Sequence, residues 1–348
     1  MSNARAAHLT RRGILAAGGA LGLGAVLAAC GDDDGKSGGS DGETGAAKSG
    51  PWTFKDDRGT TVKLDKVPVN IVAFTGVAAA LWDYGVQVKG VFGPTTTKDG
   101  KPDVQAGDMD VSKVTVLGNE WGKLDVEKYV GLQPELLATT TFDTAGTLWS
   151  VPEESKDKIA KLAPSVAISV FDRQLTQPLQ RMWELAESLG ADMKAKKVTD
   201  AKAAFDKAAA RLRAAAKAKP EIKVLAGSAS AELFYVSGTN LSVDLEYFKA
   251  LGVNFVEPSE EAKKATGGWF ESLSWENVDK YPADVIIMDD RSSTIQPADI
   301  TEGTWKQLPA VKAGQVIARS PEPILSYDKC APLLDSLAEA IEKAKKVS

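Results

Sequence analysis

Histidine is almost absent from this 348-residue sequence, and the single one, His8, lies near the N-terminus. That position falls within a predicted export signal, so the mature chain contains none. Without imidazole, the chain lacks the usual ligands of zinc, manganese and haem iron. It also lacks the general base of Ser-His-Asp and Cys-His catalysis. The sequence therefore predicts a protein that is not an enzyme and that holds no metal or other cofactor of its own.

Cysteine is nearly as scarce, because the sequence contains only Cys30 and Cys330. If Cys30 carries a lipid, as its surroundings predict, Cys330 has no partner and no intramolecular disulfide forms. Cys330 lies near the start of a predicted helix, where a thiol packs as a small apolar side chain.

Basic clusters and further long apolar runs are also missing. After residue 29 the sequence has 39 basic and 47 acidic residues, a net charge of −8. A net negative chain without a basic patch is a poor partner for nucleic acid. No later apolar run approaches the ~18 residues of a membrane-spanning helix.

The N-terminus has the pattern of a bacterial export signal. Arg5 and the pair Arg11–Arg12 precede an uncharged, Gly/Ala/Leu-rich stretch over residues 13–29. The paired arginines are typical of twin-arginine signals, and the residues Leu27-Ala28-Ala29-Cys30 resemble a lipobox. We predict a signal peptide over residues 1–29, cleavage before Cys30 and a lipid anchor on Cys30 at the outer face of the cell membrane. An uncleaved start-transfer helix is the alternative, and the acidic, Gly-rich residues 31–35 argue against it.

The rest of the chain divides into a tether and two halves. Residues 30–50 are nearly all small or polar, which predicts a flexible tether. Apolar runs typical of strands alternate with helical patterns afterwards, which predicts two α/β lobes, over residues 51–197 and 221–348. The expected strands cover residues 69–75, 88–93, 114–118, 135–140 and 165–170, then 222–229, 233–237, 254–257, 284–289 and 315–319. The expected helices cover residues 77–84, 125–131, 153–162 and 175–189, then 242–251, 275–280 and 328–345.

A long helix is predicted between the lobes, over residues 198–220. Alanine, lysine and arginine dominate it, and these are strong helix formers. Thr199 is the expected N-cap, and Pro220 ends the helix. About 20 residues at ~1.5 Å each span ~30 Å, the width of a small domain.

The two halves share a short repeated pattern. Glu127 and Glu276 each lie in the first turn of a predicted helix, which is followed by a proline and a buried strand. The spacing from glutamate to proline is seven residues in the first half and six in the second. A glutamate at a helix N-terminus also has a local role, because it interacts favourably with the helix dipole.

Several segments in the right order resemble the substrate-binding proteins of ABC importers for iron-siderophores, haem and cobalamin. They are Trp52-Thr-Phe-Lys-Asp-Asp-Arg-Gly-Thr-Thr-Val, Val69-Asn-Ile-Val-Ala-Phe-Thr, Leu124-Asp-Val-Glu-Lys-Tyr-Val-Gly-Leu-Gln-Pro-Glu-Leu-Leu, Lys161-Leu-Ala-Pro-Ser-Val and Trp305-Lys-Gln-Leu-Pro-Ala-Val-Lys-Ala-Gly-Gln-Val. The resemblance covers nearly all of the folded part. It implies two Rossmann-like α/β lobes joined by one long helix, with a ligand cleft between the lobes.

The resemblance also implies partners. In this family one glutamate per lobe docks onto arginines of the permease, which works with an ATPase, and Glu127 and Glu276 occupy those motif positions. Asp125 stands where the family usually has asparagine, a change that we expect to alter helix capping little because both residues cap well. We expect the protein to act as a monomer.

Ligands of α/β lobes bind beyond the carboxyl ends of strands, and many of the residues expected there are aromatic or basic. The candidate ligand-binding residues are Trp121, Phe142, Trp149, Tyr235, Trp269, Phe270, Arg291 and Tyr327. Core packing is the alternative for the aromatic residues, and an ion pair with Asp289 or Asp290 is the alternative for Arg291.

Arginine and aromatic faces suit a bulky chelate with oxygen-rich edges. We expect a ferric siderophore, which brings its own metal ligands. A hydroxamate is favoured over a catecholate because few basic residues are available for a highly negative complex. Haem and cobalamin remain alternative ligands, and a ligand-sensing lipoprotein remains an alternative role.

Overall fold

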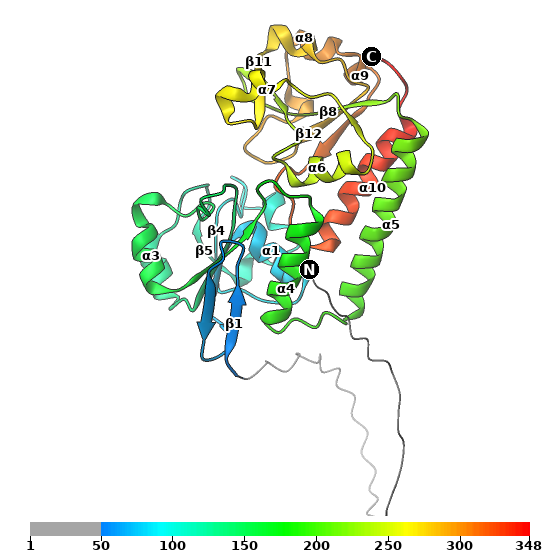
Figure 1. The fold of residues 1–348 in the computed structure, drawn as a ribbon. Coiled ribbons are helices and arrows are strands. Elements are labelled where there is room, and N and C mark those ends of the chain that lie inside the picture. Colours follow the sequence, from blue (N-terminus) through cyan, green and yellow to red (C-terminus); the bar gives the residue numbers. More distant parts are fainter. Residues whose placement is uncertain (1–49) are drawn as a thin grey trace, which may run out of the picture. The chain divides into compact units, whose positions relative to one another are not determined.

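The computed structural model describes residues 50–348 (Figure 1). The predicted signal peptide, the lipobox with Cys30 and nearly all of the tether lie outside the described residues. Within residues 50–348, no helix is both long enough and apolar enough to cross a membrane.

The first lobe is built on a parallel sheet. A short antiparallel hairpin, β1 (Trp52–Lys55) and β2 (Thr61–Leu64), precedes it. The sheet has the order β5-β4-β3-β6-β7. Its strands are β3 (Ile71–Phe74), β4 (Gly90–Phe92), β5 (Thr115–Gly118), β6 (Leu136–Thr141) and β7 (Ser165–Ser169), and its helices are α1 (Thr75–Asp83), α2 (Val126–Gly131), α3 (Lys156–Leu162) and α4 (Thr176–Ser188).

Burial explains why these strands read as continuous apolar runs. Every residue of β3 and β6 is buried, as expected of central parallel strands covered by helices on both faces. Ala73 lies opposite Val91 of β4 and Ala138 of β6, so short apolar side chains meet in the middle of the sheet. Asp125 caps α2 by accepting hydrogen bonds from the backbone N–H groups of Glu127 and Lys128, which confirms that it caps well.

The second lobe has a mixed sheet with the order β11-β9-β8-β12-β13, and β10 pairs with β8. Its strands are β8 (Lys223–Ala229), β9 (Leu233–Ser237), β10 (Asn254–Phe255), β11 (Phe270–Ser274), β12 (Val285–Asp289) and β13 (Val316–Arg319), and its helices are α6 (Val243–Ala250), α7 (Glu260–Lys263), α8 (Gly303–Gln307) and α9 (Pro309–Lys312). Strands β9 and β11 run antiparallel to their neighbours. This edge departs from the repeat of the first lobe, and β11 has no counterpart among the expected strands.

Two long helices, α5 (Lys196–Ala218) and α10 (Tyr327–Lys343), pack side by side and link the lobes (Figure 1). The expected N-cap at Thr199 is wrong, because α5 begins at Lys196. The Thr199 hydroxyl instead donates to the carbonyl oxygens of Ala195 and Lys196, one turn back along the chain. Leu212 and Leu334 are among the fully buried apolar residues of these two helices.

The return connection through α10 is fixed at both ends. At its start, Ser326 Oγ donates to Asp83 Oδ2 of the first lobe over 2.6 Å. Beyond its end, the Lys345 backbone N–H donates to Gln315 Oε1 of the second lobe over 2.7 Å. The lobes are therefore joined by a helix pair rather than by one helix alone.

Asp284, the fully buried residue that directly precedes β12, binds the C-terminal tail. Its carboxylate accepts the backbone N–H groups of Lys223, Val347 and Ser348 and pairs with Lys346. Burial raises the pKa of this carboxyl, but these hydrogen bonds outweigh burial and lower the pKa to about 2.

We expect Asp284→Asn to lower the free energy of unfolding by about 2 kcal/mol at pH 7, because charge-assisted hydrogen bonds are lost. The folded pKa lies below the unfolded value of ~3.9, so this stabilisation is present above about pH 4 and is lost as the pH falls towards 2. Urea unfolding at pH 7, 5, 4 and 3 should show the difference from wild type shrinking at the acid end. The exposed Asp157→Asn serves as the control, and a difference that does not change with pH would contradict the assignment.

Candidate functional site

A cavity of about 490 Å³ opens between the lobes. The residues that line it come from both lobes, and most lie at or after the carboxyl ends of the parallel strands β6, β8, β12 and β13, where α/β folds place their ligands. They are Phe142, Asp143, Thr147, Trp149, Ser228, Ser237, Ser242, Trp269, Phe270, Asp289, Arg291, Arg319, Pro321 and Glu322. Five of the eight residues predicted to bind the ligand are among them. We call this cavity the cleft.

Aromatic rings form one wall of the cleft. Phe142 lies against Trp149 of its own lobe, with ring centroids 4.4 Å apart, and against Trp269 of the other lobe at 6.2 Å. Trp149 is held by β6, since its backbone N–H donates to the Thr140 carbonyl oxygen. Trp269 follows Gly268, whose φ of +97° is strained for any residue with a side chain. The loop thus needs glycine to present this indole.

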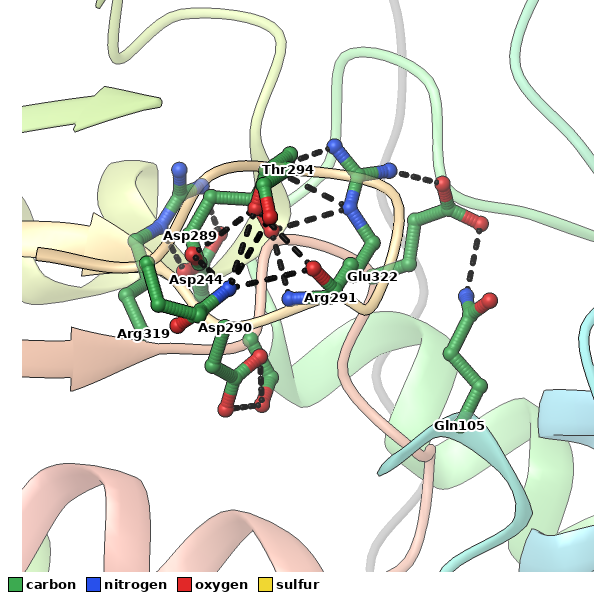
Figure 2. A network of polar contacts seen from close by, with 10 residues as sticks. Gln105, Asp244, Asp289, Asp290, Arg291, Thr294, Arg319 and Glu322 are labelled. Atoms are coloured by element: carbon green, nitrogen blue, oxygen red, sulfur yellow. Dashed lines mark hydrogen bonds and ion pairs between the residues drawn. The ribbon is translucent and has the colours of Figure 1, made fainter. Parts of the chain in front are cut away.

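Arg291 is the main cation of the cleft, and Figure 2 shows its guanidinium among carboxylates. Its Nε and Nη2 donate to the carboxylate of Asp289, and its Nη1 donates to Glu322 over 2.6 Å. The ring of Trp121, from the first lobe, lies 5.6 Å from the guanidinium carbon in a cation–π contact. Gln105, also from the first lobe, donates to the second oxygen of Glu322 over 3.3 Å. The Arg291 network therefore connects the two lobes.

These contacts determine the charge state of the network. Burial opposes the charge on Arg291, but the hydrogen bonds and charge of Asp289, followed by those of Glu322, outweigh it and raise the pKa of the guanidinium. Burial raises the pKa of Glu322 above its usual range, although the charge of Arg291 opposes this. Three of the five N–H groups of Arg291 are used by carboxylates, which leaves two for a ligand.

A second arginine, Arg319, also reaches the cleft, but its charge is fully paired. It forms a bidentate ion pair with Asp244, at 2.8 and 2.9 Å, and the two side chains are only 5% and 1% exposed. Loss of either partner would leave a buried charge uncompensated. Arg319 therefore orders the end of β13 and contributes little free positive charge to the cleft.

Three of the predicted residues lie elsewhere than expected. Trp121 contacts Arg291 without lining the cleft, and Tyr235 packs against the cleft residue Phe270 at 5.2 Å. Tyr327 is only 6% exposed, and its ring packs edge-on against Trp183 and Phe205 within the helices. The structure thus places Tyr327 in the interface between helices and not at the cleft.

The sequence analysis did not identify Arg319 and Glu322 as cleft residues. Arg319 could have been found, because it is the last residue of an expected strand. Glu322 lies between Pro321 and Pro323 on the segment leading to α10, where no local pattern marks it.

The comparisons with known proteins agree with this architecture. A family model described as periplasmic binding protein matches residues 72–323. The chain belongs to the periplasmic binding protein family. The resemblance drawn from the motifs, the two-lobed α/β fold and the expectation that the chain is not an enzyme are thereby confirmed.

Several solved structures are similar to this periplasmic binding protein. DesE, a ferric-siderophore receptor protein from Streptomyces coelicolor, is 92% identical over 85% of this chain and 100% of DesE, with a TM-score of 0.85. The siderophore periplasmic binding protein from the fuscachelin gene cluster of Thermobifida fusca is 21% identical over 79% of this chain and 96% of its own, with a TM-score of 0.56. The petrobactin-binding protein YclQ from Bacillus subtilis is 19% identical over 84% of this chain and 99% of YclQ, with a TM-score of 0.61. The latter two share the fold, and no curated protein sequence matches the chain.

Proposed function

We propose that this periplasmic binding protein captures a ferric siderophore in the cleft and delivers it to an ABC importer. The observation that carries the proposal is the cleft itself, in which Arg291 and the aromatic wall face a volume of about 490 Å³. This volume falls within the usual range of small-molecule sites. The 92% identity to the ferric-siderophore receptor DesE supports the same ligand class.

The side chains of the cleft favour a ligand that coordinates its own iron. The chain has no histidine after His8, and the carboxylates of Asp289 and Glu322 form ion pairs with Arg291. A ferric siderophore needs no ligand from the protein. It needs hydrogen-bond donors for the chelate oxygens and apolar faces for the linkers, which Arg291 and the rings of Phe142 and Trp269 supply.

Charge balance favours a hydroxamate ligand. Asp143, Asp289 and Glu322 line the cleft with Arg291 and Arg319, so three acidic residues face two basic ones. Hydrogen bonds from Thr147 lower the pKa of Asp143, which keeps its negative charge. A ferric trihydroxamate is neutral, whereas a ferric tris-catecholate carries three negative charges and would meet no excess of positive charge. Haem and cobalamin remain alternative ligands, although none of the residues that line the cleft specifically favours them.

Delivery would use the two exposed glutamates. Glu127 lies in the first turn of α2, and Glu276 lies in the first turn of a 3-10 helix, Trp275–Lys280, in the other lobe. Both are exposed, so each can meet an arginine of a permease. In this proposal residues 51–197 and 221–348 form the lobes, residues 198–220 bridge them, and the tether at residues 30–50 joins them to a lipid on Cys30.

Tryptophan fluorescence tests the ligand class, because three of the eight tryptophans, Trp121, Trp149 and Trp269, lie at or beside the cleft. We expect a ferric trihydroxamate to quench the emission saturably at sub-micromolar concentration. A ferric catecholate, haem and cobalamin should bind much more weakly. Saturation by haem or cobalamin instead would overturn the ligand assignment, and no response to any of the four would oppose transport of these ligands.

The docking role is tested by replacing Glu127 and Glu276 together with alanine. We expect uptake of the iron complex by cells to be lost while ligand affinity stays unchanged, because both residues lie outside the cleft. The matched control replaces the exposed residues Glu154 and Glu261 in the same way. Normal uptake with the Glu127/Glu276 variant would rule out the docking assignment.

A further inference from the structure

A second cavity, of about 380 Å³, lies on the other side of the Arg291–Glu322 ion pair. We call it the back cavity. Arg291 and Glu322 are the two residues that line both this cavity and the cleft, so their ion pair forms a shared wall. The remaining lining comes from the stretch 102–108 of the first lobe, from Asp290 of the second, and from α10 with the segment that leads into it. Nothing in the proposed transport role uses this space.

Two carboxylates of the back cavity lack a cationic partner among the described residues. Asp103, only 3% exposed, accepts hydrogen bonds from the Ser292 hydroxyl at 2.5 Å and the Gln105 backbone N–H at 3.0 Å. Both oxygens of Asp290 lie near the Ser320 hydroxyl, at 3.0 and 2.8 Å. Figure 2 shows the Asp290 carboxylate pointing away from the guanidinium of Arg291. All of these donors are neutral.

The other charged residues of the back cavity are already paired. Lys329 Nζ lies 2.5 Å from Asp108, and Arg291 pairs with Glu322 at 2.6 Å. The lining thus carries two negative charges, one from each lobe, without a counter-ion. Burial and the neighbouring charge of Asp289 raise the pKa of Asp290, and they outweigh the opposing effects of the Ser320 hydrogen bond and of the charge of Arg291.

The geometry does not favour a metal ion as the occupant. Among the described residues, the three carboxylates close enough together to hold one are Asp83, Asp108 and Asp328, and Lys329 already lies within 3.1 Å of the last two. Asp103 and Asp290 do not belong to this group. The back cavity also has an apolar part, formed by Val104, Pro323, Ile324 and Leu333. An occupant should therefore combine a positive head with a short hydrocarbon chain.

The buried side-chain amide of Gln105 also favours a ligand that carries hydrogen-bond donors. Gln105 lines the back cavity and is 4% exposed; its Nε2 donates to Glu322, whereas its Oε1 has no hydrogen-bond partner within residues 50–348. A buried acceptor without a hydrogen bond costs free energy. A bound molecule that donates a hydrogen bond to this oxygen would remove that cost.

We propose that the back cavity binds a primary alkylammonium ion. The charge of its head is neutralised by Asp103 and Asp290, and its methylene groups pack on Ile324 and Leu333. An ammonium supplies three N–H donors, which suits carboxylates that have free lone pairs. Because Asp103 belongs to the first lobe and Asp290 to the second, the bound ion links the lobes across the wall formed by Arg291 and Glu322. This assignment stands whichever ligand occupies the cleft.

An NMR titration of the protein with n-butylammonium chloride at constant ionic strength, observed on the ligand, tests the proposal with the cleft empty. We expect saturable binding to wild type and to the surface control Asp157→Asn. Binding to the double variant Asp103→Asn/Asp290→Asn should be weaker by about tenfold or more, since charge-assisted hydrogen bonds are lost. The neutral isostere n-butanol should not compete.

Three outcomes would overturn the proposal: no saturable binding to wild type, equal binding to the double variant, or competition by n-butanol. Displacement of n-butylammonium by an equal concentration of Mg²⁺ would also overturn it, in favour of an inorganic cation. If the double variant does not fold, Asp290→Asn alone replaces it, because this side chain is half-buried and its side-chain hydrogen-bond partner is the Ser320 hydroxyl. We expect the single variant to bind about fivefold more weakly, and unchanged binding would count against the proposal.

Discussion

A half-buried guanidinium between two lobes needs partners for its charge, and the arrangement of the cleft follows from how Arg291 obtains them. Asp289 holds it from the end of β12, Glu322 from the segment before α10 and Trp121 from the first lobe. Each partner comes from a different part of the chain, so the network forms only once both lobes are folded and in contact. Because carboxylates use three of its five N–H groups, Arg291 is positioned in advance and still able to donate to a ligand.

The helix pair α5 and α10 keeps this network in place. The chain crosses between the lobes through α5 and returns through the segment that carries Glu322 into α10, whose start is bound to Asp83 of the first lobe. Two packed helices, fixed at both ends, resist the wide hinge bending that flexible connectors permit. This favours ligand capture through small changes in the angle between the lobes. The cleft and the back cavity would both respond to such a change, because Arg291 and Glu322 border them both.

The sequence predicted the buried parts of the fold well and the polar parts of the site less well. Central strands such as β6 and β12 are recognisable because both faces are buried, which leaves an unbroken apolar run. Strand β11 was missed because Phe270-Glu-Ser-Leu-Ser274 is short and half exposed. Arg291 could be predicted from its place after a strand. Glu322 becomes part of the site only through tertiary contacts with Arg291 and Gln105, which are distant in the sequence. Tyr327 was predicted at the cleft because it directly precedes an expected helix. In the structure its ring instead packs between helices.

A crystal structure of the protein with a bound ferric trihydroxamate tests the central claim most directly. The account predicts that the chelate lies in the cleft and that its hydroxamate oxygens accept hydrogen bonds from the free N–H groups of Arg291. Phe142 and Trp269 should pack against the linkers, and the ion pairs of Arg291 with Asp289 and Glu322 should persist. A chelate bound outside the cleft, or one that makes no contact with Arg291, would contradict the account.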